Sequence, residues 1–320
     1  MLNPFQKGYV KSKEHKQKLM DTIKNQCRWA SSLGELEGTA EQAWGTTEYR
    51  DRNEPTVFMG MYDLRDYVAL WRHKGKAWVL WCGSDIRSLR ANFVFNDGKL
   101  KWLSYLFANE GFKDFLIKHV LSKAEHWVEN EAEAWQLKDI GLKVSGICPS
   151  FMGKIKDYKV SFKPGNNVYL SANPGREEEY GWGLVDMIAC ALPQVEFHLI
   201  GSEWTKYRQP LKNVHVYKRM PKKVMNKMIR KMQCGLRLNK HDGFSEITAK
   251  SVLWGQYPIT YLYHPKIDQY TKDDCGQPWC VEGLNNLIKL LEKIPKKRKA
   301  NLKARKYYQQ TLNFFPWAKK

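Results

Sequence analysis

Short apolar runs alternate with amphipathic stretches of helical length along most of this chain, beginning at Pro55. Apolar and β-branched runs bounded by Gly, Pro or polar clusters predict buried strands. Strands are expected at 56–62, 77–82, 143–148, 168–172, 195–201, 214–217, 234–238 and 258–263. Helices are expected at 63–73, 110–121, 123–140, 180–192, 221–232 and after Gly243. Alternating strands and helices predict an α/β fold with parallel sheets.

Stretches rich in Gly, Pro and polar residues divide this pattern. Gly153, Pro164 and Gly165 lie among lysines between two α/β units, and a lysine-rich amphipathic segment that Pro295 interrupts follows the second unit. A length of 320 residues fits two domains of ordinary size. The expected segments are a helical and loop extension (1–54), a first domain (55–150), a linker (151–167), a second domain (168–280) and a basic helical tail (281–320). A charged helix is expected at 11–30 and a small hairpin at 92–102.

Positive charge is concentrated in the last third of the chain. Residues 1–200 carry 27 Lys and Arg against 25 Asp and Glu, a net charge of +2. Residues 201–320 carry 26 against 8, a net charge of +18. Such an imbalance is typical of a protein with a polyanionic partner: nucleic acid, an anionic membrane surface or a phosphorylated substrate. A solvated surface that only aids solubility is the alternative.

Other features of the composition narrow the class of protein. No apolar run approaches the roughly 20 residues that span a bilayer, and the N-terminus lacks the apolar core of a signal peptide, so we expect a cytoplasmic protein without a transmembrane segment. The seven cysteines are scattered, which favours reduced thiols. Cys275 and Cys280 follow His264, but no second ligand pair accompanies them, so no metal site is expected.

The most informative stretch runs from His241 to Lys250. An apolar strand precedes it, Gly243 lies in a polar turn, and a helix and another strand follow. This arrangement presents free backbone N–H groups to a phosphate. The alternative is an ordinary βαβ unit in which Gly243 serves only the turn. In the first unit, Gly60 and Gly83 also lie near the carboxyl ends of strands, where open α/β sheets place their ligands.

Several short motifs occur in the order and at the spacing of a known family. They are Gly83-Ser84-Asp85 and residues 132–149 in the first unit, and 171–181, Asp242-Gly243-Phe244-Ser245 and 255–259 in the second. In these motifs the chain resembles the GT-B glycosyltransferases over about residues 55–263. The similarity is greatest to the retaining group, whose C-terminal domain carries an acid-Gly-Phe…Gly-x-Pro signature.

The resemblance implies two Rossmann-like domains that face each other across a cleft and bind a nucleotide sugar, a UDP-sugar in particular, without a metal or another cofactor. It implies catalytic roles for Asp85 and Asp242, with Asp242 accepting hydrogen bonds from sugar hydroxyls. The diphosphate would lie against Arg176 and the N–H groups that follow Gly243. The implied donor-binding residues are Gly60, Gly83, Arg176, Arg237, His241, Gly243, Phe244, Ser245, Glu246 and Lys250.

Three positions depart from the pattern of the family. Lys250 stands where the family has a second Glu, expected to contact the ribose. An i,i+4 ion pair with Glu246 is the simpler explanation of this lysine, and a changed nucleotide contact is the functional one. Tyr180 replaces a Lys, which leaves Arg176 with less help, and Cys82 replaces a His expected near the sugar.

The sequence therefore predicts a glycosyltransferase that moves a sugar from a nucleotide sugar to a polyanionic acceptor. The basic C-terminal third would suit DNA with hydroxymethylated bases, as in phage glucosyltransferases of the same fold class. It would equally suit an anionic membrane-linked glycan. One alternative is a non-catalytic nucleic-acid-binding α/β protein derived from such an enzyme. Another is a sugar-phosphate isomerase or epimerase of similar fold.

Overall fold

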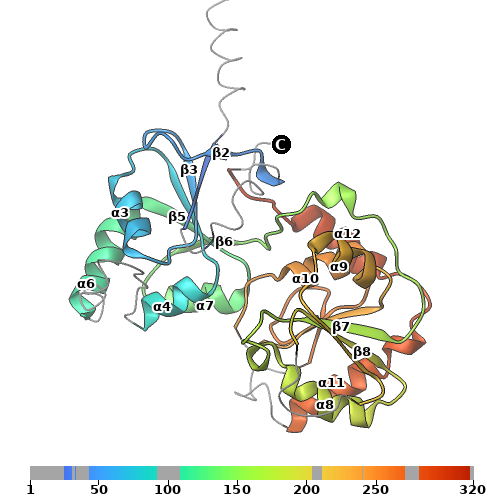
Figure 1. The fold of residues 1–320 in the computed structure, drawn as a ribbon. Helices are drawn as coiled ribbons and strands as arrows, with labels where there is room; N and C mark the ends of the chain where they lie inside the picture. The colour runs from blue at the N-terminus through green and yellow to red at the C-terminus, as the bar shows by residue number, and fades with distance from the viewer. Residues whose placement is uncertain are drawn as a thin grey trace, which may run out of the picture.

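Two lobes, each built on a parallel six-stranded sheet, make up the computed structural model (Figure 1). The structure describes residues 25–30, 33, 43–91, 109–203, 211–239, 241–270 and 281–317. The hairpin expected at 92–102, most of the helix expected at 11–30, and Cys275 and Cys280 lie outside these ranges. The α/β class that the sequence predicts is confirmed.

The first lobe contains a sheet in the order β2-β1-β3-β4-β5-β6. Its strands are β1 (Gln26–Trp29), β2 (Thr47–Glu48), β3 (Thr56–Met59), β4 (Ala77–Leu80), β5 (Ala124–Val128) and β6 (Val144–Ile147). Its helices are α3 (Leu64–Arg72), α4 (Ser84–Arg90), α6 (Glu110–Phe115) and α7 (Glu131–Asp139). Strands β3 and β4 are buried throughout, because helices or chain segments cover both faces of the sheet.

The expected helix at 123–140 is wrong over its first part, which forms strand β5. His126 and Val128 are buried while Glu125 and Trp127 are partly exposed, and this alternation is that of a strand. The imidazole of His126 accepts a hydrogen bond from Trp81 Nε1 (3.2 Å), which fixes β5 beside β4. The helix begins only at Glu131, where the Asn130 side chain accepts a hydrogen bond from the Glu133 N–H.

The N-terminal segment differs from the expected helical and loop extension. Residues 26–29 and 47–48 form strands β1 and β2 of the first sheet. Strand β1 pairs along its whole length with β3, with Cys27 opposite Val57. The first sheet therefore begins before Pro55, and β1 and β2 form one of its edges.

The second lobe contains a sheet in the order β12-β11-β10-β7-β8-β9. Its strands are β7 (Asn167–Ser171), β8 (Glu196–Ile200), β9 (Val214–Tyr217), β10 (Cys234–Arg237), β11 (Ile259–Thr260) and β12 (Asp268–Gln269). Its helices are α8 (Trp182–Ala191), α9 (Lys222–Ile229), α10 (Glu246–Leu253), α11 (Val281–Leu291) and α12 (Leu302–Thr311). Numbered from β7, this is the Rossmann order 3-2-1-4-5-6, which reverses direction between β7 and β10.

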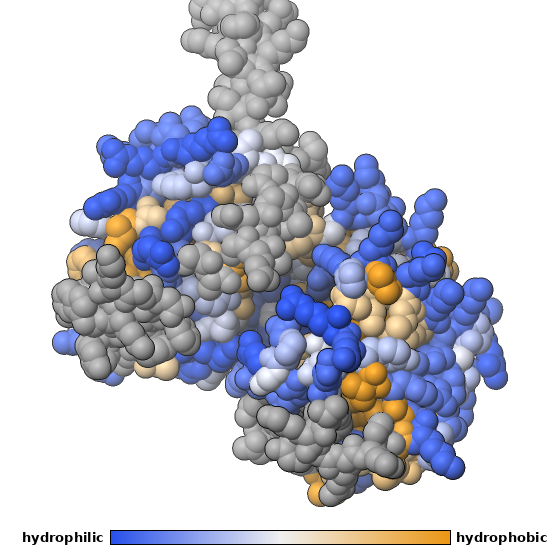
Figure 2. Space-filling view, in the orientation of Figure 1, coloured by the Kyte–Doolittle hydropathy of each residue, from blue (hydrophilic) through white to orange (hydrophobic). Residues whose placement is uncertain are grey.

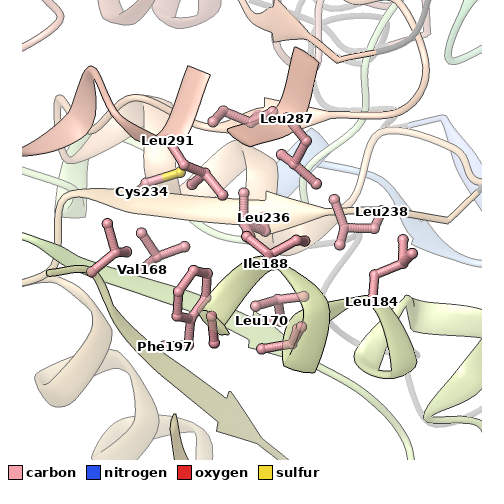
Figure 3. Packing of buried hydrophobic residues seen from close by; sticks show 14 of the residues in the cluster. Val168, Leu170, Leu184, Ile188, Phe197, Cys234, Leu236, Leu238, Leu287 and Leu291 are labelled. Carbon is pink, nitrogen blue, oxygen red and sulfur yellow. The ribbon is translucent and has the colours of Figure 1, made fainter. Parts of the chain in front are cut away.

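Helices cover both faces of the second sheet. On one face, α8 and α11 pack against the strands through Ile188, Leu287 and Leu291 (Figure 3). On the other face, α9 and α10 contribute Ile229 and Ile247. Helix α12 packs on the outside of α10, so three helices are grouped on this side of the lobe.

The chain crosses between the lobes twice. It leaves the first lobe after β6, and it returns after α12, where Phe315 and Trp317 enter the core of the first lobe. These two rings stack on each other at 4.4 Å, and Trp317 also contacts Trp44 and Trp78. The end of the segment expected as a basic tail is thus an apolar part of the first lobe. Among the helices that the structure describes, none has the length and apolar character to cross a membrane.

Candidate functional site

A cavity of about 300 Å³ lies at the carboxyl ends of β7 and β10 in the second lobe. This is the point where the strand order reverses, and open α/β sheets bind their ligands at such points. The two strand ends, the loop before α10, and helices α9 and α10 supply its walls. Its lining is Ser171, Ala172, Asn173, Tyr180, Met225, Arg237, Asp242, Ser245, Glu246, Ile247 and Lys250.

An ion pair between Arg237 and Asp242 forms one wall of the cavity. Arg237 ends β10, and its Nε donates to Asp242 Oδ2. The guanidinium lies 4.5 Å from the centre of the Tyr180 ring, within the range of a cation–π contact. Burial disfavours the charged form of Arg237, but Asp242 and Tyr180 outweigh burial and raise its pKa. The three side chains therefore hold one another in place.

Helix α10 directs its N-terminus at the cavity. Ser245 caps the helix, since its Oγ accepts a hydrogen bond from the Thr248 N–H (3.2 Å). The side chain of Phe244 points away from the cavity and stacks on Tyr308 of α12 at 4.9 Å. The ring of Phe244 thus anchors the loop, while Ser245 and Glu246 line the cavity.

Residues of the first lobe bind the backbone of this loop. Glu129, just beyond β5, accepts hydrogen bonds from the N–H groups of Phe244 (2.8 Å) and Ser150 (3.1 Å). Asn130 Nδ2 donates to the Asp242 carbonyl oxygen (3.0 Å). A Cβ at Gly243 would overlap Glu129 Oε2, so glycine is required here for the two lobes to approach.

Two carboxyl groups lie together at this contact. Glu133 Oε2 accepts a hydrogen bond from the Glu129 N–H (2.8 Å), whereas Glu133 Oε1 is buried and has no hydrogen-bond partner in the part of the chain that the structure describes. Burial raises the pKa of Glu129 to about 7. Burial and the neighbouring Glu129 raise the pKa of Glu133 well above its ordinary value. The pair therefore retains a proton near neutral pH.

The predicted residues of the first lobe lie at the carboxyl ends of β3 and β4. Gly60 and Gly83 have positive φ angles of 79° and 88°, and a Cβ at Gly83 would lie 2.9 Å from Glu133 Oε1. Asp85 is fully buried and accepts hydrogen bonds from the N–H groups of Met61 (3.0 Å) and Cys82 (3.1 Å). Burial raises the pKa of Asp85 to about 6. Its carboxylate ties the two strand ends together and lies outside the lining of the cavity.

The remaining predicted residues divide between the cavity and its surroundings. Arg176 pairs with Glu179 on the surface, and its guanidinium lies 5.9 Å from the Tyr180 ring. His241 is exposed beside the loop. Lys250 is fully buried, and its Nζ lies 3.2 Å from Glu246 Oε1, so the expected i,i+4 pair is present.

Glu129, Asn130 and Glu133 are not among the site residues that the sequence predicts. Because 123–140 has helical composition, these residues fall in the interior of the expected helix. A strand that ends at Val128 places them at the carboxyl edge of the first sheet, where functional groups collect. In the sequence, Glu125-His126-Trp127-Val128 does not alternate between polar and apolar residues, so no local pattern locates these three residues. Within the described ranges, His, Cys, Asp and Glu side chains form no group of three or more placed to hold a metal ion.

Comparison with known proteins places the fold. No family model and no curated protein sequence matches this chain. The structure is similar to that of sucrose-phosphate synthase from Thermosynechococcus elongatus, with a TM-score of 0.53, 9% identity, and coverage of 82% of this chain and 70% of the other. It is also similar to the pneumococcal O-GlcNAc transferase GtfA, solved with UDP and GlcNAc, with a TM-score of 0.51, 10% identity and coverage of 81% and 54%. The fold is of the GT-B type.

A third GT-B structure supports this assignment. The lipopolysaccharide outer core galactosyltransferase WaaB matches with a TM-score of 0.50 and 13% identity, over 82% of this chain and 73% of the other. The chain spans about half the length of other matches, 50% for TarM and 54% for GtfA. In the GT-B arrangement, the cavity at β7 and β10 lies in the second of the two Rossmann-like lobes, beside the contact with the first.

Proposed function

We propose that this protein is a glycosyltransferase that binds a nucleotide sugar in the cavity at the carboxyl ends of β7 and β10. The observation that carries the proposal is the position of this cavity, at the point of strand reversal and beneath the N-terminus of α10. Partial positive charge at a helix N-terminus and the Arg237 guanidinium suit the phosphates of such a donor. The GT-B neighbours GtfA and TarM were solved with UDP, which supports a UDP-sugar.

Sugar transfer breaks one bond of the donor and forms one bond to the acceptor. The bond between the anomeric carbon and the phosphate oxygen breaks, and the nucleoside diphosphate leaves with the electron pair. The acceptor oxygen bonds to the anomeric carbon, and the acceptor hydroxyl passes its proton to the departing diphosphate. Positive groups that bind the departing diphosphate stabilise the charge that develops on it. Here we assign this role to Arg237 and the N-terminus of α10, with Arg176 at the rim, and we propose that no divalent metal is needed. Retention of configuration is proposed from the resemblance to the retaining group.

Asp242 is the carboxylate placed to contact the sugar of the donor. It lines the cavity, Arg237 fixes its side chain, and Asn130 of the first lobe fixes its backbone. Carboxylate oxygens accept hydrogen bonds from sugar hydroxyls. Asp85, whose carboxylate is occupied by backbone N–H groups, would act by shaping the strand ends of the first lobe.

A basic surface on the second lobe supports a polyanionic acceptor. We define it by exposed cations of the interlobe segment, of α9 and the turn after it, and of the segment before α12: Lys159, Lys163, Lys227, Arg230, Lys231, Arg298 and Lys299. Ser161 Oγ of the interlobe segment donates to the Arg230 carbonyl (2.8 Å). Tyr257, whose ring packs against Phe162 of the interlobe segment, donates its hydroxyl to the Lys299 carbonyl (2.8 Å). On the face that Figure 2 shows, hydrophilic residues cover much of the described part of this lobe. We propose DNA with hydroxymethylated bases or an anionic membrane-linked glycan as the acceptor.

A donor screen tests the proposal. A nucleotide sugar that binds at 100 times its Kd stabilises the folded protein by about 2.7 kcal/mol, which thermal unfolding detects. UDP, GDP, UDP-glucose, UDP-GlcNAc and GDP-mannose are tested first. The donors that raise the melting temperature are then incubated with hydroxymethylated DNA and with lipid-linked glycans, and the products are weighed by mass spectrometry. Binding without any transferred sugar, or no binding at all, contradicts the proposal.

A second candidate function is binding of nucleic acid without catalysis. The ion pair Arg237–Asp242 favours it, because it occupies the Arg237 guanidinium of the cavity lining within the protein. This candidate predicts salt-sensitive binding to DNA and no change of melting temperature with any nucleotide sugar. The donor screen therefore separates the two functions.

A further inference from the structure

Lys250 is a buried ammonium whose environment is incomplete. Its side chain has no exposed surface, yet it lines the cavity. The Nζ lies 3.2 Å from Glu246 Oε1, but the contact does not have hydrogen-bond geometry, and among the described residues Nζ has no hydrogen-bond partner. A buried charge that keeps unsatisfied donors is costly to the folded state. An acceptor in the cavity would remove this cost.

Glu246 has a second and closer partner. Lys222 of α9 places its Nζ 2.6 Å from the same oxygen, Glu246 Oε1. The carboxylate of Glu246 therefore stays neutralised when Lys250 turns to another group. Lys222 is exposed, whereas Lys250 is enclosed beside the cavity, so the two lysines are not equivalent.

The rest of the lining makes Lys250 the cation that a ligand can recruit. Among the described residues of the lining, the cationic side chains are Arg237 and Lys250. Arg237 is held by Asp242 and by the ring of Tyr180, which also lines the cavity. The charges of Arg237 and Asp242 cancel, while Lys222 and Lys250 together exceed Glu246 by one positive charge.

We propose that Lys250 binds the diphosphate of the nucleotide sugar by exchanging Glu246 for phosphate oxygens, while Lys222 keeps Glu246. This inference rests on the proposed function, because it assumes that the cavity binds a nucleotide sugar. It also predicts that the cavity prefers a nucleoside diphosphate to a monophosphate and to a nucleoside. A diphosphate gains the full attraction of the enclosed ammonium, a monophosphate gains less, and a nucleoside gains none.

Isothermal titration of the wild-type protein and Lys250→Met with UDP, UMP and uridine tests the exchange. Methionine is similar in length and apolar, so it fills the buried site without a charge. We expect UDP to bind Lys250→Met about 10- to 100-fold more weakly, because a buried charge-assisted hydrogen bond is lost, and uridine to bind both proteins equally. Lys223→Met removes one charge from the neighbouring exposed position of α9, and we expect it to leave UDP affinity unchanged.

Glu246→Gln supplies the second readout. If Lys250 exchanges partners, this variant releases the ammonium in advance, and UDP binds as tightly as to the wild type or more tightly. If the Lys250–Glu246 pair only supports the fold, UDP binds more weakly to Glu246→Gln. Equal affinity of the wild type and Lys250→Met for UDP overturns the role of Lys250 and leaves the proposed function intact. Failure of the wild type to bind UDP, GDP, ADP, CDP or dTDP overturns the proposed function itself.

Discussion

Asp242 forms one hydrogen bond through its side chain and one through its backbone, so a substitution can change the first and keep the second. Its carboxylate is bound by Arg237, and its carbonyl oxygen by Asn130. Replacement by Asn keeps the shape and the backbone contact but removes the negative charge. We expect Asp242→Asn to bind UDP as tightly as the wild type or more tightly, because Arg237 is released toward phosphate. Sugar transfer should fall about 100-fold, since the acceptor for the sugar hydroxyls is weakened.

Calorimetry of UDP binding and a transfer assay with the donor from the screen check this prediction together. Lys223→Met, on the exposed surface of α9, is a control that should change neither quantity. Weaker UDP binding with full transfer activity would show that Asp242 supports the phosphate site and not the sugar.

Glu133 predicts a pH dependence of stability. The raised pKa values of Glu129, about 7, and of Glu133 mean that the folded protein holds protons that the unfolded chain releases above about pH 4.5. The free energy of unfolding therefore falls as the pH rises from about 4.5 through the raised pKa values of the two glutamates in the folded protein. Glu133→Gln removes one of the two charges and keeps an acceptor for the Glu129 N–H. We expect Glu133→Gln to raise the free energy of unfolding at pH 8 by more than at pH 5.5. The two increases should differ by at least about 1 kcal/mol.

Urea unfolding at the two pH values measures this difference. Histidines with lowered pKa values, such as His126 and His264, add the opposite slope, but they do so in both proteins and cancel in the comparison. Glu131→Gln, exposed on the same helix, controls for the loss of a carboxylate from α7. A difference independent of pH would mean that the Glu129–Glu133 pair does not share a proton.

Local sequence patterns predict contacts within an element better than contacts between lobes. The pair Glu246–Lys250 follows from helix geometry alone, because residues four apart lie on one face. The hydrogen bond from the Phe244 N–H to Glu129 joins residues 115 positions apart. It depends on the approach of two separately folded lobes, and no short motif records that approach. The sequence predicts that Gly243 lies in a phosphate-binding turn, whereas its close contact with Glu129 comes from the packing of the lobes.

At the scale of elements, apolar periodicity predicts the strands whose burial is continuous. The expected strand at 77–82 is present as β4, and the expected helix at 63–73 as α3 with Asp63 as its cap. Strand β5 is missed because Ala124 and Glu125 favour a helix locally, while two neighbouring strands impose the extended form. The short strands β2 and β12, of two residues each, are too brief to give a period.

The C-terminal segment after α12 is an element of the first lobe. Trp317 is 1% exposed and contacts Trp44, Trp78 and Trp127. We expect Trp317→Ala to lower the stability of the first lobe by about 3–5 kcal/mol through loss of buried area and the cavity left behind. Amide hydrogen exchange should increase in β1, β3 and β4 and stay unchanged in β7 and β8.

Phe314 provides a matched control for this variant. It is an aromatic residue of the same segment, but 60% of it is exposed. Phe314→Ala should therefore change the stability of the first lobe by less than about 1 kcal/mol. Equal loss in both variants would indicate that the segment acts through its backbone contacts with Cys148 and not through the Trp317 ring.

At the scale of the whole molecule, the two lobes meet at the loop that borders the cavity. The order of the motifs in the sequence predicts two Rossmann-like domains and a site between them, and the GT-B fold confirms the two domains. The exact limits of the domains stay predictions. The first lobe contains residues from both parts of the sequence, Cys27 and Trp29 early in the chain and Phe315 and Trp317 late in it. A single boundary along the sequence therefore does not separate the two lobes.

The basic surface gives the molecule an asymmetric charge, and this asymmetry predicts how an acceptor is held. Each phosphate that a cation neutralises contributes about 0.9 to the slope of log K against log salt for duplex DNA. A variant with Lys163, Arg230, Lys231 and Lys299 all changed to Gln should therefore lose up to about 3.6 of that slope and bind DNA more weakly at low salt. Its affinity for UDP should not change, because none of these side chains lines the cavity.

Fluorescence anisotropy with duplex DNA measures DNA binding, and sedimentation with vesicles containing phosphatidylserine measures membrane binding, each at several salt concentrations. Loss of DNA binding with retained vesicle binding assigns the basic surface to a nucleic-acid acceptor, and the reverse assigns it to a membrane-linked glycan. If neither changes, the positive charge of the last third of the chain is a solvated surface, and the acceptor is recognised elsewhere.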